Sequence, residues 1–343
     1  MKQKFLLALI AAIFFTMLSA GLSLKYLSSP LALASEQQVE VLYGDTVYKV
    51  AGKLQQQGVL EYPTLWIWYA RLFDMGRQLK AGEYRIRPGM SPLELLDDIV
   101  NARVIDYPVT LIEGWTTADA IRALHSAHGI VATLAPDDHA AILRAVNADP
   151  SYRHSEGLFF PSTYRYIKGT RDRDILERAY QRQQQELAAA WQQAQGKSLP
   201  YKTPYDLLIM ASIIEKETAV DEEREQIAGV FVQRLNRGMR LQTDPTVIYG
   251  MGERYQGRIG RADLLRPTPY NTYTRHGMPP TPIALPGQAS LQAAANPLLN
   301  DKLYFVGKGD GYHHFSATLP EHNEAVRRYQ LSRPGDYRST PAP

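Results

Sequence analysis

TPYDLLIMASIIEKET (203–218) is the stretch of sequence that decides how the larger part of this chain folds. Thr203, Pro204 and Asp206 form a helix start, with a hydroxyl N-cap, a proline at the first helical position and an acid in the first turn. Leu207–Ile214 follows and is apolar on nearly every side. Such a helix belongs inside a domain core and not on its surface. We therefore expect the larger domain to be built around it.

Two carboxylates, Glu215 and Glu217, appear abruptly at the end of this apolar run. Glu217 falls on the same helical stripe as apolar residues one and two turns earlier, so its carboxyl should be partly desolvated. Desolvation raises a carboxyl pKa, as a general acid near neutral pH requires. Alternatively, the helix simply leaves the core and its acids meet solvent or pair with Lys216 and Arg224. Residues two apart lie on different faces, so at most one of the acids should point into a given cleft, and spacing does not choose between them.

The overall composition limits the classes of function. A chain of 343 residues suits about two domains, and 45% hydrophobic with 21% charged residues exclude wholesale disorder. The net charge of +3 gives no support for nucleic-acid binding. The absence of cysteine excludes disulfides, thiolate metal sites and cysteine nucleophiles. No histidine and acid cluster has the spacing of a metal site, His313–His314 is interpreted as part of a turn, and no cofactor is expected.

The N-terminus predicts export of the chain. Lys2 and Lys4 precede the uncharged run Phe5–Leu24, and the next charge is Lys25. About 20 helical residues span about 30 Å, the hydrocarbon thickness of a bilayer, and the leading lysines favour a cytoplasmic N-terminus. The alternative is a cleaved signal peptide with an A-x-A-like site in Leu31–Ala34, but the apolar run exceeds a normal signal core. Both interpretations place the rest of the chain outside the cytoplasm.

The chain is predicted to be an α+β protein with a transmembrane helix, a small LysM-like βααβ unit and a larger α+β catalytic domain. In the small unit, Val39–Tyr43 alternates like a strand, and Gly44–Asp45–Thr46 turns into a helix. This opening resembles the LysM glycan-binding module, although a spacer without a ligand would look the same. The predicted boundaries are 1–25 for the cytoplasmic end and anchor, 26–37 for a linker, 38–105 for the LysM-like unit, 106–331 for the catalytic domain and 332–343 for a flexible tail.

Proline-stiffened polar segments follow the glutamate helix. They are 240–250, 269–273 and 277–283, and they carry tyrosines and short polar side chains. Rigid segments of this kind can preorganise a polar cleft at low entropic cost, or they can be tight connections without a ligand.

Several motifs in order resemble those of the YceG-like family: ASIIEKET (211–218), LQTDPTVIYG (241–250), YNTY (270–273) and GMPPTPI (277–283). The resemblance covers nearly the whole chain, including 156–161 and 304–323. One small departure is Met278, where the family commonly has leucine.

This resemblance implies a bacterial inner-membrane enzyme with a single-pass anchor and a periplasmic catalytic domain. Family members cleave the β-1,4 bond between N-acetylmuramic acid and N-acetylglucosamine in nascent glycan strands and leave 1,6-anhydro-muramyl ends. The family's catalytic glutamate is the second acid of the Glu-Lys-Glu-Thr motif, here Glu217. Gln242, Asp244, Asn271 and Tyr273 are hypotheses for substrate contacts, and Asp244 could instead only cap the turn before Pro245.

The expected partners are peptidoglycan glycan strands and the membrane, with peptidoglycan synthases left open and nucleic acid not expected. Two other functions remain open at this point. One is a muramidase that hydrolyses the same bond, and the other is a non-catalytic, membrane-tethered glycan-binding scaffold of the cell-wall synthesis machinery.

Overall fold

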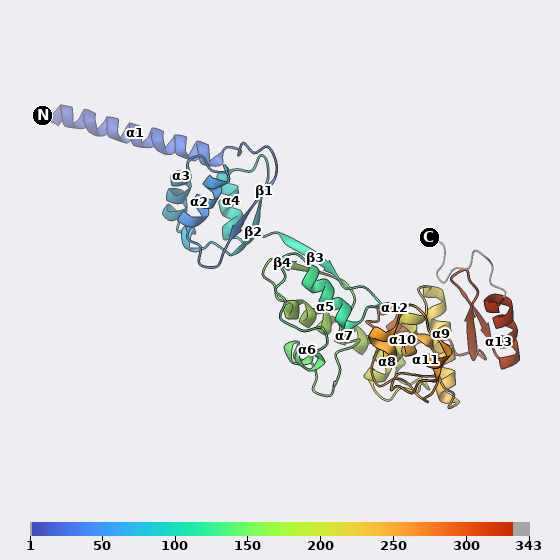
Figure 1. Ribbon diagram of the computed structural model, residues 1–343. Helices are drawn as coiled ribbons and strands as arrows, with labels where there is room; N and C mark the ends of the chain where they lie inside the picture. The colour runs from blue at the N-terminus through green and yellow to red at the C-terminus, as the bar shows by residue number, and fades with distance from the viewer. Residues whose placement is uncertain (1, 332–343) are drawn as a thin grey trace. The chain divides into compact units, whose positions relative to one another are not determined.

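The computed structural model describes residues 2–331, so the tail predicted at 332–343 lies outside the described residues. The chain is a mixed α+β protein that divides into two compact units (Figure 1). Unit 1 runs to residue 107 and takes back residues 165–169, and unit 2 holds 108–164 and the chain from residue 170 onward.

Unit 1 opens on a long helix and continues as strand, helix, helix, strand, helix. The elements are α1 (Lys2–Ser28), β1 (Gln37–Val41), α2 (Val47–Gln56), α3 (Pro63–Leu72), the 3-10 turn η1 (Met75–Arg77), β2 (Gly82–Ile86) and α4 (Pro92–Val100). Strands β1 and β2 pair antiparallel, with Val39 opposite Tyr84. The order between β1 and β2 is the βααβ order expected from the sequence, while the likeness to LysM stays a prediction.

Helix caps and an apolar core hold unit 1 together. The Ser91 hydroxyl accepts the Glu94 N–H at 3.2 Å, and the Glu94 carboxylate accepts the Ser91 N–H at 2.7 Å, so a capping box starts α4. Trp66 of α3, Leu54 of α2 and Tyr84 of β2 are fully buried in one core. Full burial of a large apolar side chain is worth about 1.5–3 kcal/mol, so these side chains fix how the helices pack on the strand pair.

Helix α1 is long and apolar enough to cross a membrane, with a mean hydropathy of 2.4 over an 18-residue window. The residues after the apolar run do not form the free linker expected at 26–37. Leu27 and Leu31 are buried in the core of unit 1, and the Leu31 N–H donates to the carbonyl of Met90 at 2.8 Å. The gain from burying these two leucines outweighs the polar character of the serines around them.

The stretch of residues 106–331 contains most of the helices and two small strand pairs. Its elements are β3 (Asp106–Thr110), α5 (Thr117–Ser126), α6 (His139–Ala145), β4 (Thr163–Ile167), α7 (Asp172–Ala194), α8 (Pro204–Glu217), α9 (Asp221–Asn236), α10 (Asp244–Met251), the 3-10 turn η2 (Gly252–Arg254), α11 (Arg261–Leu265), α12 (Gln288–Ala295), β5 (Tyr304–Gly307), β6 (His313–Ser316), α13 (Leu319–Val326) and the π-helical turn η3 (Arg327–Leu331). Strand β3 pairs with β4 and β5 with β6, and the division between the units falls within the β3–β4 pair.

Helix α8 lies in the core of unit 2, which confirms the prediction from its apolar sequence. Every residue of Leu207–Ile214 is buried, and the helix packs against α7, α9 and α12. Thr203 and Asp206 form the expected capping box, in which the Asp206 carboxylate accepts the Thr203 N–H at 2.9 Å. The start and direction of α8 are therefore fixed locally, and its position is fixed by packing on all sides.

Helix α5 is capped by Thr116, and the hydroxyl of the next residue, Thr117, contacts the buried Glu156. One local prediction was wrong. The segment interpreted as a proline-stiffened loop forms helix α10 (Asp244–Met251). Pro245 permits this helix because it lies in the first turn, where a missing N–H costs nothing.

Gly229 of helix α9 lies against the backbone of Leu298, so we expect a substitution of this glycine to have a strong effect. A Cβ atom at this position would lie 2.0 Å from the carbonyl oxygen of Leu298. Gly229→Ala should therefore destabilise the protein by about 1–3 kcal/mol, because α9 or the 298 segment must shift. Gly52→Ala on α2 is the control, since nothing lies within 4 Å of its added Cβ. The control should be neutral or stabilise by up to about 1 kcal/mol, so equal losses for the two variants in chemical denaturation would contradict the assignment.

Candidate active site

Glu217, the last residue of α8, opens onto a cavity in unit 2, which we call the Glu217 cavity. Its volume is about 530 Å³, and its walls come from α8, α9, the segment that leads into α10, the β5–β6 pair and α13. The lining residues are Glu217, Phe231, Arg234, Leu241, Gln242, Thr243, Asp244, Tyr273, Tyr304, Phe305, Val306, Gly307, His313, Leu319, His322, Asn323 and Val326.

The two acids of the motif point to different surroundings, as their spacing required. Glu215 accepts the backbone N–H of Gly287 at 2.9 Å and lies 3.8 Å from the buried guanidinium of Arg224. It does not line the Glu217 cavity. Glu215 is thus engaged in holding the 287 segment and α9 to α8, which leaves Glu217 as the acid of this motif that faces the cavity.

The carboxyl of Glu217 is placed to hold a proton near neutral pH. Burial raises the pKa of Glu217 to about 7, and the nearby Asp244 carboxylate acts in the same direction. The Thr243 hydroxyl and the Arg234 guanidinium act in the opposite direction and lower this pKa, because both stabilise the carboxylate form. The desolvation that the sequence predicted for this carboxyl is therefore present, and it is the largest effect.

A set of buried threonines fixes the hydroxyl that contacts Glu217. Thr243 donates its hydroxyl to Glu217 Oε1, and its own backbone N–H donates to the Thr272 hydroxyl at 3.1 Å. The Thr246 hydroxyl donates to the Thr243 carbonyl at 2.8 Å and lies 2.9 Å from the Thr272 hydroxyl. The contact occupies Oε1 and leaves Oε2 of Glu217 free for a proton.

Arg234 of α9 supplies a buried positive charge to the cavity lining. Its Nε donates to the Leu303 carbonyl at 2.7 Å, one Nη donates to the Leu241 carbonyl at 2.6 Å, and its guanidinium lies 5.1 Å from the ring centre of Tyr304. Burial lowers the pKa of Arg234, but the carbonyls and the ring face stabilise its cationic form. The guanidinium is thus rigidly held without an ion pair to Glu217.

Three of the four residues predicted to contact substrate line the Glu217 cavity. Gln242 has a positive φ of 52° and begins the turn that presents Thr243. Asp244 is the first residue of α10, and its carboxylate accepts the Tyr273 hydroxyl at 2.6 Å. Burial and the adjacent Asp244 carboxylate raise the pKa of Tyr273, so the phenol stays protonated.

Asn271 is the exception, because its side chain is used inside its own loop. It is buried, its amide donates to the carbonyls of Asp263, Leu264 and Arg266, and its Oδ1 accepts the Tyr273 N–H at 2.9 Å. The amide does not line the cavity. These bonds give Asn271 a role in positioning Tyr273, and its contact with substrate stays a prediction.

The far wall of the cavity contains residues that the sequence analysis did not assign. His313 begins strand β6 and is not part of a turn, and its Nδ1 lies 2.7 Å from the Glu223 carboxylate. His322 stacks on Tyr304 with ring centres 5.2 Å apart, and burial lowers its pKa. The match of segment 304–323 to a family was the available signal, since neither histidine has a local partner in the sequence.

A second buried carboxyl, Glu156, supports the other end of α10. It accepts the Thr117 N–H at 2.8 Å and the hydroxyl of Tyr249, a residue of α10, at 3.0 Å. Burial raises the pKa of Glu156 to about 7. Because Glu156 does not line the Glu217 cavity, its contacts point to a structural role in holding α10 and the start of α5.

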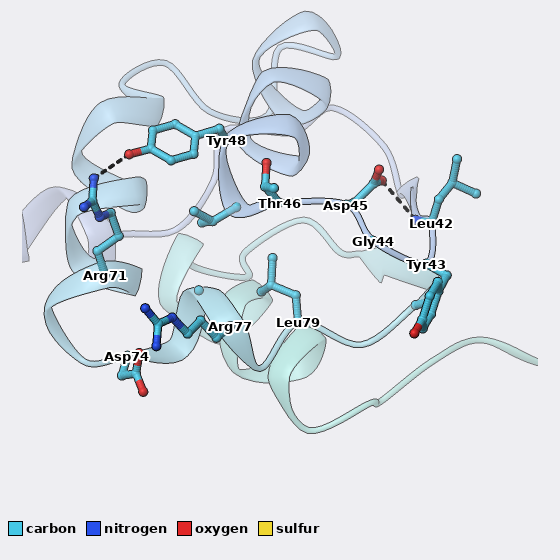
Figure 2. A pocket seen from close by; sticks show the side chains of 13 residues that line it. Leu42, Tyr43, Gly44, Asp45, Thr46, Tyr48, Arg71, Asp74, Arg77 and Leu79 are labelled. Atoms are coloured by element: carbon cyan, nitrogen blue, oxygen red, sulfur yellow. Dashed lines mark hydrogen bonds between the residues drawn. The ribbon is translucent and has the colours of Figure 1, made fainter.

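Unit 1 has an open groove of about 820 Å³, shown in Figure 2 and here called the Tyr43 groove. Tyr43, one of its lining residues, is almost fully exposed. Elsewhere in the lining, Arg71 donates to the Tyr48 hydroxyl at 2.5 Å. Its acid Asp45 accepts hydrogen bonds from Lys49 and Lys53, which hold the pKa of that carboxyl far below its usual range. This groove is larger than the Glu217 cavity, but it holds no carboxyl with a raised pKa comparable to that of Glu217 among the groups whose pKa is shifted. The glycan contact expected for this unit stays a prediction.

The fold and the cavity define an α+β protein in which one desolvated acid at the end of a core helix faces an open, tyrosine-lined cavity. The model of the YceG-like family matches residues 39–328, and the chain belongs to this family.

Characterised relatives extend over most of the chain. It is 29% identical over 312 residues to the endolytic murein transglycosylase of Bacillus subtilis, covering 86% of this chain and 85% of that protein. It is 27% identical over 360 residues to the endolytic murein transglycosylase of Streptococcus pneumoniae, covering 94% of this chain and 64% of that protein. A crystal structure of a Listeria monocytogenes protein described as yceG-like matches with a TM-score of 0.51 and 27% identity, over 84% of this chain and 98% of that one.

The contact between Thr243 and Glu217 predicts how a substitution would change the acid's pKa. Because the hydroxyl lowers this pKa, Thr243→Val should raise the pKa of Glu217 above about 7, and Thr243→Ser should leave it near the wild-type value. Carboxyl-carbon NMR titration measures the change, with the Glu217 signal assigned by its loss in Glu217→Gln. An unchanged or lower pKa in Thr243→Val would contradict the geometry.

Proposed function

We propose that this chain is an endolytic peptidoglycan lytic transglycosylase that cleaves the MurNAc-β-1,4-GlcNAc bond of nascent strands and leaves 1,6-anhydro-MurNAc ends. The observation that carries the proposal is the Glu217 carboxyl, with a pKa of about 7, at an open polar cavity. The names of the relatives support murein as the substrate and transglycosylation as the reaction.

In the first step, protonated Glu217 donates its proton to the glycosidic oxygen as the bond to muramic C1 breaks. Oε2 is the oxygen that carries this proton, because Thr243 occupies Oε1. The developing glutamate anion is stabilised by the Thr243 hydroxyl and by Arg234, the two groups that lower its pKa. Positive charge develops at C1, on the substrate side of the cavity.

In the second step, the Glu217 carboxylate removes the proton from the C6 hydroxyl of the same muramic residue, and O6 attacks C1. The first proton stays on the departing GlcNAc hydroxyl and the C6 hydroxyl proton re-protonates Glu217, so the enzyme is restored without water. An intramolecular hydroxyl has a high effective molarity, and no second carboxylate is needed to activate a nucleophile. Gln242, Tyr273 and Asp244 are proposed to position the sugar through hydrogen bonds.

Hydrolysis by a muramidase is the second candidate, and Asp244 is the observation that favours it. Glycosidases that use water have two carboxylates beside the scissile bond, and Asp244 lines the same cavity as Glu217. Against this role, its carboxylate is already hydrogen-bonded to the Tyr273 hydroxyl at 2.6 Å. Single-carboxyl chemistry is therefore the better supported reaction, with Asp244 as a positioning residue that also raises the Glu217 pKa.

We further propose that α1 anchors the chain in the bacterial inner membrane with the two units in the periplasm. The length and apolar surface of α1 support the anchor, and the lysines at positions 2 and 4 support a cytoplasmic N-terminus. Such an anchor would keep the Glu217 cavity near newly made strands. Peptidoglycan synthases are natural candidates for partners of an enzyme placed there.

Digestion of isolated sacculi by the purified chain tests the reaction. Glu217→Gln should lower the rate of strand cleavage by at least about 10²-fold, the usual contribution of a general acid. Glu215→Gln is the matched control and should keep most of the activity, because Glu215 faces Gly287 and not the cavity. Mass spectrometry should find anhydro ends, lighter than reducing ends by one water. Reducing ends would establish hydrolysis, and an active Glu217→Gln variant would remove Glu217 from the mechanism.

The pH dependence of kcat/KM tests the protonation state. Since Glu217 must begin protonated, kcat/KM should fall as the pH rises through about 7. In Thr243→Val the loss of the hydrogen bond raises the pKa, so the basic limb should move to higher pH, while Thr243→Ser should keep the wild-type limb. A basic limb that is the same in all three proteins would assign it to another group.

A further inference from the structure

The end of helix α1 is built into unit 1 and is not joined to it by a flexible chain. Leu27 is 3% exposed and lies in the core of the unit. The Tyr26 hydroxyl accepts the backbone N–H groups of Glu61 at 3.0 Å and Tyr62 at 3.1 Å, and the Tyr26 and Tyr62 rings pack edge to face at 5.2 Å. The unit therefore has a fixed orientation relative to the axis of α1.

These contacts place the start of α3 at the level where α1 would leave a bilayer. At about 1.5 Å per residue, Tyr26 lies only about 3 Å along the helix axis beyond Leu24, where the apolar run ends. Tyr62 contacts Tyr26 and directly precedes α3, which also packs against α1. Figure 1 shows α3 beside the end of α1, with the β1–β2 pair on the other side of the unit.

The outward face of α3 is apolar and aromatic, although unit 1 leaves it uncovered. Its inner face buries Trp66 and Ala70 completely. On the outer face, Trp68 is 67% exposed, Leu72 is 78% exposed one turn later, and Phe73 is 56% exposed at the helix end. An exposed apolar cluster of this kind marks an interaction surface, and tryptophan and tyrosine favour the boundary between lipid and water.

We propose that α3 lies in the headgroup layer of the bilayer that α1 crosses, with Trp68, Leu72 and Phe73 inserted among the lipids. This inference rests on the proposed membrane anchoring by α1. Lipid is the occupant that the structure favours, because α3 packs against α1 and the residue before it contacts Tyr26, next to the end of the apolar run. The exposed Lys25 at the end of α1 would lie at the same level, where anionic headgroups attract it. Unit 1 would thus be held against the membrane surface and not free to swing.

Single-cysteine probes test the proposal directly, because the chain contains no cysteine. The full-length protein is reconstituted in nanodiscs of phosphatidylethanolamine and phosphatidylglycerol, with an environment-sensitive fluorophore at Leu72→Cys. Ile10→Cys within α1 is the control for membrane insertion, and Arg85→Cys on β2 is the control for water exposure. Nitroxide-labelled lipid quenches from the bilayer, and iodide quenches from water.

We expect the probe at position 72 to be quenched by nitroxide lipid, as at position 10, and to be protected from iodide, unlike the probe at position 85. If position 10 is quenched by lipid while position 72 is quenched by iodide, the anchor holds and the α3 proposal is wrong. Protection of position 72 from both quenchers would show that protein covers α3, and this also overturns the proposal. If lipid fails to quench position 10, the anchoring and the α3 proposal both fail.

Discussion

Burial of α8 on every side is the constraint on which the rest of the structure depends. A helix without a polar face has to be surrounded by α7, α9, α10 and α12, and its C-terminal residue, Glu217, then emerges from the core at the cavity. The raised pKa of Glu217 is a direct result, since desolvation disfavours the charged carboxylate. The same packing separates the two acids of the motif, because Glu215 turns toward Gly287 and Arg224. Core packing and acid chemistry are thus two consequences of one apolar stretch.

The features that could be predicted from the sequence are the local ones. The capping box of Thr203 and Asp206 and the apolar run after it specify α8 within a few residues, so helix, burial and desolvated acid followed from one segment. Physics alone did not select Glu217 over Glu215, since the direction of each side chain depends on elements far along the chain. His313 illustrates the limit, because its partner Glu223 lies 90 residues earlier. Asn271 illustrates the same limit, because the sequence pattern does not show that its amide binds the carbonyls of its own loop.

Helix α10 connects parts of the site that come from different sequence motifs. Its first turn carries Asp244 and follows Thr243, which contacts Glu217, while Tyr249 near its other end is held by the buried Glu156. At the start of the helix, the Thr246 hydroxyl donates to the Thr243 carbonyl and contacts the Thr272 hydroxyl, so this pair of threonines holds Thr243 in place. The motifs around residues 156, 217, 243 and 271 therefore act together: those distant from the cavity set the position of α10, and α10 sets the position of the hydroxyl on Glu217.

The cavity combines groups that raise the pKa of Glu217 with groups that lower it. A carboxyl that first donates and then accepts a proton in one reaction must have both forms within reach at working pH. Burial and Asp244 alone would raise the pKa further, and the carboxyl would be a weaker acid for the first step. A closer approach of Arg234 would lower the pKa and reduce the fraction of protonated carboxyl that the first step needs. The Thr243 hydroxyl and a guanidinium bound to backbone carbonyls instead oppose the desolvation only in part, and the resulting pKa of about 7 suits both steps.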